Sequence, residues 1–187
     1  MIFNFTLMLS GVAYDTEGLE DALFTAGCDD GLVCAYGNSV YLVFDREAAN
    51  LDAAISSAVE QIEGAGIGAR VQSVDSDMVG LSDIAEICEL SRQSIAMLKD
   101  GLRGEGHFPS PVQRITGKSP LWSWAEVAVW LVKNGRLDAD SVLVENAKTL
   151  HRWNLALQMS GSPQAWEIEA LAKSLNARRE RQQKGLA

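Results

Sequence analysis

The side chains best suited to molecular recognition in this chain lie in one short run, Ser91-Arg92-Gln93-Ser94. A serine that precedes a helix accepts hydrogen bonds from the first backbone N–H groups, so Ser91 is expected to cap a helix and to leave the next three side chains on its exposed first turn. Arginine can form two hydrogen bonds with guanine, and glutamine can do so with adenine. The first turn of a recognition helix meets base edges in the major groove, which makes double-stranded DNA the expected ligand. The alternative is an exposed helix of a protein-binding module.

A helix-turn-helix between residues 81 and 100 is expected to hold this run in place. The pattern has a small residue, Ala85, where two helices cross, a tight turn at Glu89 and an apolar anchor at Ile95. Ser82 is expected to cap the first helix. Lys99, at the far end of the second helix, suits a phosphate contact. The remaining core positions are assigned to Leu81, Ile84, Ile87, Leu90 and Leu98.

Residues 81–131 resemble the AlpA/MerR-type winged helix-turn-helix of phage regulators, excisionases and bacterial regulators, over about a quarter of the chain. The similarity rests on several short motifs, separated by gaps. They are L-S-D-I-A from Leu81, L-S-R-x-S-I from Leu90, F-P-x-P-V from Phe108 and W-x-x-x-E-V-x-x-W-L from Trp122.

The resemblance implies a DNA-binding wing and a closing helix. The wing is a β-hairpin expected over Val112–Trp122, and the closing helix is expected over Ser123–Val132. Arg114 and Lys118 lie near the tip of the expected wing, where the family contacts the phosphate backbone. The alternative for these two residues is ordinary surface charge. The predicted DNA-binding set is therefore Ser91, Arg92, Gln93, Ser94, Lys99, Arg114 and Lys118.

Three departures from the family reduce the DNA affinity expected of one subunit. Glu89 occupies a turn position where glycine is usual, and a left-handed conformation there costs roughly 1 kcal/mol. Ala96 and Met97 stand where the family often has tyrosine and arginine, and residues 102–107 form a longer connection than usual. We therefore expect a homodimer, or an extra contact from the basic tail, to complete binding.

The N-terminal part of the sequence alternates strand and helix periodicities in the order β-α-β-β-α-β. Two such βαβ units predict a four-stranded antiparallel sheet with two helices on one face, the ferredoxin-like arrangement that ACT-type regulatory domains also use. The opposite sheet face could pair with a second copy, bind a ligand or be polar. The expected elements are residues 2–9, 19–26, 32–35, 40–44, 51–62 and 69–74.

Helical spacing returns after residue 136. It predicts one helix over residues 143–157, a break at 160–163, and a last helix that carries Trp166, Leu171 and Leu175. The basic tail, residues 178–184, is expected to fray. The predicted fold is α+β, with a ferredoxin-like βαββαβ sandwich at 1–76, a winged helix-turn-helix at 77–136 and a C-terminal helical hairpin with the basic tail at 137–187.

Charge is unevenly distributed around a formal net of -9. Residues 1–79 contain two basic and 13 acidic side chains, whereas residues 80–136 and 137–187 each contain seven basic and six acidic ones. An acidic N-terminal third can therefore coexist with a phosphate-binding face elsewhere on the molecule.

The sequence shows no grouping of residues that is typical of catalysis, a metal site or a cofactor site. The two histidines are isolated, and the three cysteines lack CxxC spacing, which predicts reduced, partly buried thiols. The N-terminus carries neither a signal peptide nor a long apolar run, so we expect a cytoplasmic protein that does not enter a membrane. We expect no enzyme activity, no metal and no cofactor. The residues concerned are His107, His151, Cys28, Cys34 and Cys88.

The preferred interpretation is a dimeric, sequence-specific transcriptional regulator that binds double-stranded DNA and can regulate its own operon. Two alternatives keep the DNA-binding part. In the first, the protein is antitoxin-like, and its acidic N-terminal domain binds a basic toxin while the helix-turn-helix represses the operon. In the second, an ACT-like domain binds an amino acid or another small molecule and changes the DNA affinity.

Overall fold

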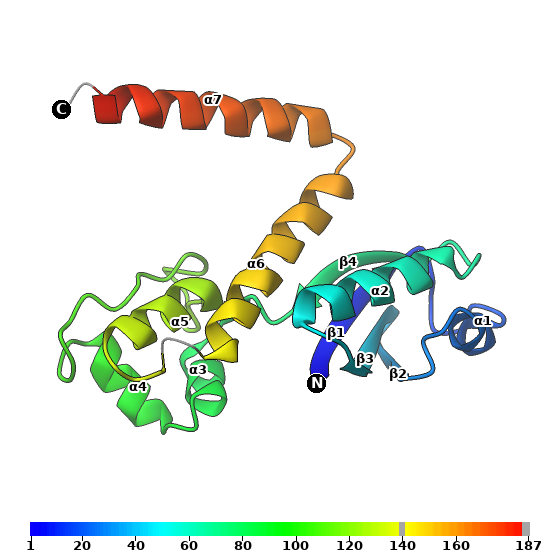
Figure 1. Cartoon of the computed structure of the whole chain (residues 1–187), viewed down its shortest axis with the longest axis horizontal. Coiled ribbons are helices and arrows are strands. Elements are labelled where there is room, and N and C mark those ends of the chain that lie inside the picture. The colour runs from blue at the N-terminus through cyan, green and yellow to red at the C-terminus, as the bar shows by residue number, and fades with distance from the viewer. Residues whose placement is uncertain (139–140, 185–187) are drawn as a thin grey trace.

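The computed structural model describes residues 1–138 and 141–184. Within these ranges the chain is an α+β protein with seven helices, a four-stranded antiparallel sheet and a small two-stranded sheet. The buried apolar residues form two cores, one in an α/β unit (residues 1–75) and one in a helical unit (residues 78–137). Helix α6 (Val142–Ser160) joins the two units and contributes to both cores (Figure 1).

The α/β unit has its six elements in the order expected from the sequence. They are β1 (Ile2–Ser10), α1 (Leu19–Thr25), β2 (Gly31–Tyr36), β3 (Ser39–Glu47), α2 (Leu51–Gly64) and β4 (Arg70–Asp75). The strands lie in the order β2-β3-β1-β4, and each neighbouring pair is antiparallel. Both helices pack their buried side chains against one face of this sheet. The opposite face is open.

One charged side chain lies inside the core of the α/β unit. Arg46 follows the inward-facing positions of β3 and is almost fully buried. Its guanidinium donates two hydrogen bonds to the carboxylate of Asp30, at 2.7 and 2.8 Å, and one to the hydroxyl of Ser57 at 3.0 Å. It also lies 4.8 Å from the ring centroid of Phe44. Because a buried charge is costly unless it is paired, this cluster fixes α2 and the α1–β2 connection to the sheet.

The helical unit is built around tryptophan. Its elements are β5 (Met78–Val79), α3 (Leu81–Ile87), α4 (Arg92–Lys99), β6 (Trp122–Ser123) and α5 (Trp124–Lys133). β5 pairs with β6 and thereby joins the start of α3 to the start of α5. All three tryptophans of this unit are buried in its core: Trp122, Trp124 and Trp130.

Helix α6 holds the two units together with polar as well as apolar side chains. The amide of Asn154 accepts a hydrogen bond from the Val74 N–H at 2.9 Å and donates one to the Val74 carbonyl at 2.7 Å. It therefore completes the hydrogen bonding of β4 along the edge that no strand covers. One turn earlier, Nδ1 of His151 lies 3.0 Å from the carboxylate of Asp77, in the link between the units.

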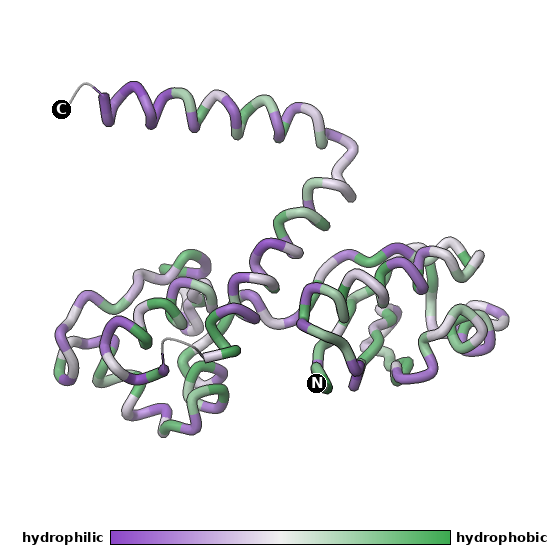
Figure 2. Tube along the Cα trace, in the orientation of Figure 1, coloured by the Kyte–Doolittle hydropathy of each residue, from purple (hydrophilic) through white to green (hydrophobic). Residues whose placement is uncertain are grey.

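The C-terminal part differs from the expected helical hairpin. Helix α7 (Ala165–Lys184) is continuous through the basic tail, so the expectation that residues 178–184 fray was wrong. The helix buries none of its residues and runs away from the end of α6, clear of both units (Figures 1 and 2). A helical hairpin needs an apolar interface between its two helices, whereas the apolar face of α6 packs into the two cores.

Candidate nucleic-acid interface

The first turn of α4 carries the candidate base-reading residues. Ser91 is the N-cap, as predicted, and its hydroxyl accepts a hydrogen bond from the Ser94 N–H at 3.1 Å. The two hydroxyl groups also lie 2.9 Å apart, so Ser94 is engaged in the cap. Arg92 and Gln93 are exposed. The cap therefore presents an arginine and a glutamine side by side at the positive end of a helix dipole.

Helix α4 is held rigidly behind this turn. Ile95 and Leu98 are buried against Ile84 and Ala85 of α3 in the core of the helical unit. Helix α3 begins differently from the prediction. Its N-cap is Gly80, whose N–H donates to the Asp83 carboxylate at 2.7 Å, so Ser82 is not the cap. The reason is that the helix begins at Leu81, which places Ser82 within its exposed first turn.

The turn between α3 and α4 is tight. Glu89 has a φ of 54°, which confirms the left-handed conformation expected at this position. The Leu90 N–H then donates to the Ala85 carbonyl at 2.8 Å, which closes the end of α3. Leu90 itself is 40% exposed, so its assignment to the core was wrong. It lies in the turn between the helices, beyond the α3 face that packs inward.

Two basic residues, Lys99 and Arg103, lie at or just beyond the far end of α4. Lys99 donates to the carboxylate of Asp100, and it is therefore partly neutralised before any phosphate approaches. Arg103 is exposed four residues further on, where the backbone N–H groups of residues 102 and 103 fold back onto the Met97 carbonyl. Arg103 was not among the DNA-binding residues predicted from the sequence, although its spacing of four residues from Lys99 could have indicated it. The exposed Glu89 lies three residues before Arg92, so acidic and basic charge are mixed at the start of α4.

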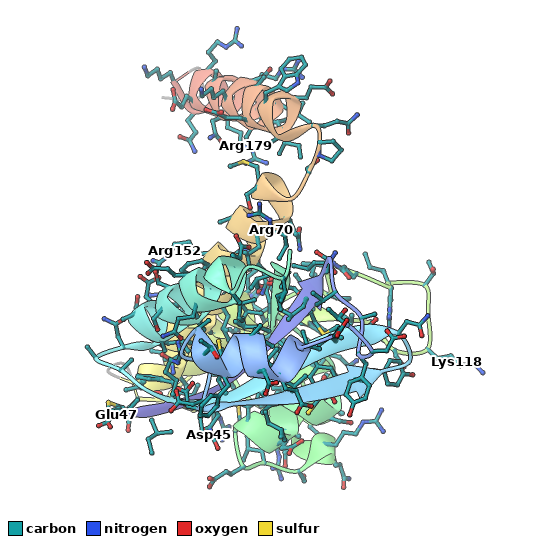
Figure 3. The ribbon with its side chains drawn as sticks, turned by 90° about the vertical axis from the view of Figure 1, so that its right-hand side faces the viewer. Asp45, Glu47, Arg70, Lys118, Arg152 and Arg179 are labelled. Atoms are coloured by element: carbon teal, nitrogen blue, oxygen red, sulfur yellow. The ribbon has the colours of Figure 1, made fainter. Side chains whose placement is uncertain are left out.

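The expected wing is a loop rather than a regular β-hairpin. Its two sides meet at one isolated bridge, where Gln113 and Leu121 exchange backbone hydrogen bonds of 3.0 and 3.2 Å. Arg114 has a φ of 52°, and its carbonyl accepts from the Gly117 N–H at 2.9 Å, so a tight turn replaces the ladder of a hairpin. Arg114 and Lys118 are both exposed on this loop. The side chain of Lys118 projects from the molecule on the side away from Asp45 and Glu47 (Figure 3).

The long connection between α4 and the wing is anchored on the tryptophan core. The indole N–H of Trp130 donates to the Gly106 carbonyl at 3.1 Å, and that of Trp122 donates to the Pro109 carbonyl at 2.9 Å. Phe108 packs edge-on against Trp130, with ring centroids 5.0 Å apart. The extra residues therefore lie over the core on the side of α5. They do not form part of the exposed first turn of α4.

The candidate residues fall into separate groups. Ser91, Arg92, Gln93 and Ser94 share one turn, Lys99 ends the same helix, and Arg114 and Lys118 lie on the wing loop. In the portion of the chain that the structure describes, no hydrogen bond or ion pair links the first turn of α4 to the wing loop. A ligand that contacts both the first turn of α4 and the wing loop must therefore be extended, as a length of DNA duplex is.

Two cysteine thiols outside the candidate interface are held in the protonated form. Burial raises the pKa of the Cys28 and Cys88 thiols, which keeps both protonated near neutral pH. Over residues 1–138 and 141–184, no three His, Cys, Asp or Glu side chains gather as metal ligands would. In the same ranges, no helix has both the length and the apolar character needed to cross a membrane.

Comparisons of the chain with family models, curated proteins and solved structures find no match. The geometry of the candidate interface is therefore the evidence for function.

Proposed function

We propose that the protein is a sequence-specific regulator that binds double-stranded DNA through the first turn of α4. The observation that carries this proposal is the Ser91 cap, which holds Arg92 and Gln93 outward on a helix anchored by buried Ile95. Side chains of these two types recognise guanine and adenine in the major groove, and rigid support preserves their geometry.

The same proposal assigns the helical unit to the winged helix-turn-helix class. It is supported by the sequence of α3, tight turn, α4, wing loop and α5, and by the β5–β6 pair that ties the two ends together. For the α/β unit we propose the ferredoxin-like arrangement, which the strand order β2-β3-β1-β4 supports. In this proposal the α/β unit is a domain that regulates DNA binding or binds a partner.

The test is a binding titration with duplex DNA from upstream of the coding sequence, against a scrambled duplex, at about 50 to 200 mM salt. Arg92→Ala is expected to weaken specific binding about 5- to 150-fold and to reduce the preference for the specific duplex. Arg114→Ala is expected to weaken both duplexes equally and to lower the salt slope by about one.

The control is Arg70→Ala, which removes an exposed arginine from the α/β unit and is expected to bind like the wild type. If the protein shows no preference for the upstream duplex over the scrambled one, its binding sequence is instead selected from a pool of random duplexes. Failure to enrich any sequence, or equal losses in Arg92→Ala and Arg70→Ala, would contradict the proposal.

A second candidate function is favoured by the open face of the sheet. Leu32, Tyr36 and Val43 are exposed there, although monomers normally keep large apolar side chains apart. Asp45 and Glu47 lie on the same face of β3 (Figure 3). We propose as the alternative that this face binds a basic partner protein. A basic protein that co-purifies with the wild type and with Arg92→Ala, but not with Leu32→Glu, would support it.

A further inference from the structure

Helix α7 leaves apolar side chains partly or largely exposed to solvent on one side of the helix. Ile168 is 40% exposed, Leu171 is 62% exposed and Leu175 is 41% exposed, at a spacing that places all three on one side of the helix. Figures 1 and 3 both show α7 clear of the α/β and helical units. We call these three residues the α7 stripe.

The length of α7 makes its isolation physically informative. The helix has 20 residues and buries none of them. Helices in water gain most of their stability from packing an amphipathic face, and a sequence with few such contacts is only marginally helical. A stable α7 therefore needs a partner on the α7 stripe.

The charges of α7 identify what kind of partner fits. Its first half contains Glu167 and Glu169 with one lysine, whereas its second half contains three arginines and a lysine with one glutamate. A second α7 aligned in parallel would place basic half beside basic half. An antiparallel second copy places each basic half beside an acidic one, which is the arrangement that electrostatics favours.

Helix geometry makes the antiparallel match specific. Glu167 and Arg178 lie on the same flank of the α7 stripe, because they are separated by 11 residues, close to three helical turns. In an antiparallel pair that sets Ile168 level with Leu175 of the second copy, Arg178 of that copy lies level with Ala165. It is then about 3 Å along the axis from Glu167. The two-fold axis creates this ion pair twice.

We propose that α7 is the dimerisation helix of this protein and that its occupant is an antiparallel α7 from a second copy of the chain. The interface consists of the α7 stripe from each copy, flanked by two Glu167–Arg178 pairs. It is isologous, so it closes at two subunits and places the two copies of the remaining chain at opposite ends of the helix pair. This inference does not depend on DNA binding.

The first test measures the mass of the full-length protein by sedimentation velocity across a concentration series without DNA. The wild type is expected to dimerise, and Leu171→Glu/Leu175→Glu is expected to raise the dissociation constant about 100-fold or more, because burial of both leucines is lost in each copy. The matched control is Ala170→Glu/Ala177→Glu, which adds the same charges to the other side of the helix and is expected to dimerise like the wild type.

Circular dichroism shows whether each variant keeps the two folded cores, and none of these residues belongs to a core. The proposal is overturned if the wild type remains a monomer throughout the concentration series. It is also overturned if the monomer pairs only when DNA is present, or uses α7 to bind another protein instead. A dimer that survives Leu171→Glu/Leu175→Glu, or that is lost in the control instead, also overturns it.

A charge exchange tests the orientation. Glu167→Arg alone and Arg178→Glu alone are each expected to weaken the dimer, because each places like charges together at both ends. The double variant Glu167→Arg/Arg178→Glu is expected to recover dimerisation. In this variant position 167 of each copy is basic and lies beside position 178 of the other copy, which is acidic. Failure of the double variant to recover, with both single variants weakened, excludes the antiparallel arrangement.

Discussion

Glu89 is a residue of the candidate interface whose backbone conformation conflicts with its type, as is Arg114 on the wing loop. The left-handed backbone of Glu89 is disfavoured for a residue with a Cβ atom. Glu89→Gly is expected to increase the free energy of unfolding by roughly 0.5–1 kcal/mol, after allowance for the greater chain entropy of glycine. Urea denaturation of the wild type and the variant measures this difference.

The control for that substitution is Glu89→Gln, which removes the charge and keeps the backbone penalty. Both variants are expected to bind duplex DNA more tightly than the wild type, because each removes an acidic group beside α4. The gain in stability is expected in Glu89→Gly alone. Equal stability of the two variants would show that the left-handed turn stores no strain.

At the scale of elements, Asn154 connects α6 to the edge of β4. Asn154→Ala leaves the Val74 N–H and carbonyl buried without partners. We expect the free energy of unfolding to fall by about 2–6 kcal/mol, since each of the two unsatisfied buried groups costs about 1–3 kcal/mol. Hydrogen exchange at the Val74 amide is expected to accelerate.

The matched control is Gln158→Ala, which removes an exposed amide one turn further along α6. It is expected to change stability by less than about 0.5 kcal/mol. If Asn154→Ala is no more destabilising than Gln158→Ala, then Asn154 does not hold the two units together.

The elements that the sequence predicts well are those that depend on local spacing. Alternation in β1 identified its buried face, and Ser91 identified the start of α4, because a cap and its helix are neighbours in the chain. The wing was expected as a hairpin from resemblance alone. Its actual shape depends on the turn at Arg114 and on anchoring of the preceding connection to Trp122 and Trp130.

Contacts between distant residues could not be predicted in the same way. Asn154 and Val74 are 80 positions apart, and nothing in either local pattern indicates their pairing. Arg46 gave a partial signal, since it continues the inward alternation of Val40, Leu42 and Phe44. Its partner Asp30 lies 16 positions earlier, in the connection between α1 and β2, where no local pattern indicates the pairing.

At the scale of the whole molecule, α6 makes the stability of one unit depend on the other. Its Val144 and Ala147 are buried in the core of the helical unit, and its Leu157 is buried in the core of the α/β unit. We therefore expect both units to unfold in one transition. Leu7→Ala, in β1, is expected to lower the free energy of that transition by about 2–5 kcal/mol.

Tryptophan fluorescence can report this coupling. In a Trp153→Phe/Trp166→Phe background, the remaining tryptophans all lie in the helical unit. Leu7→Ala is expected to shift their urea midpoint as far as it shifts the circular dichroism signal. A fluorescence midpoint that does not move would mean that the helical unit unfolds independently.

The pairing of Asn154 with β4 has a consequence for synthesis on the ribosome. β4 emerges 80 residues before the side chain that covers its edge. At about 5–20 residues per second, the nascent chain presents an uncovered strand for roughly 4–16 s. Uncovered strand edges recruit strands from other chains. The period of greatest exposure to aggregation is therefore set by translation speed between codons 74 and 154, and slower translation of that stretch lengthens it.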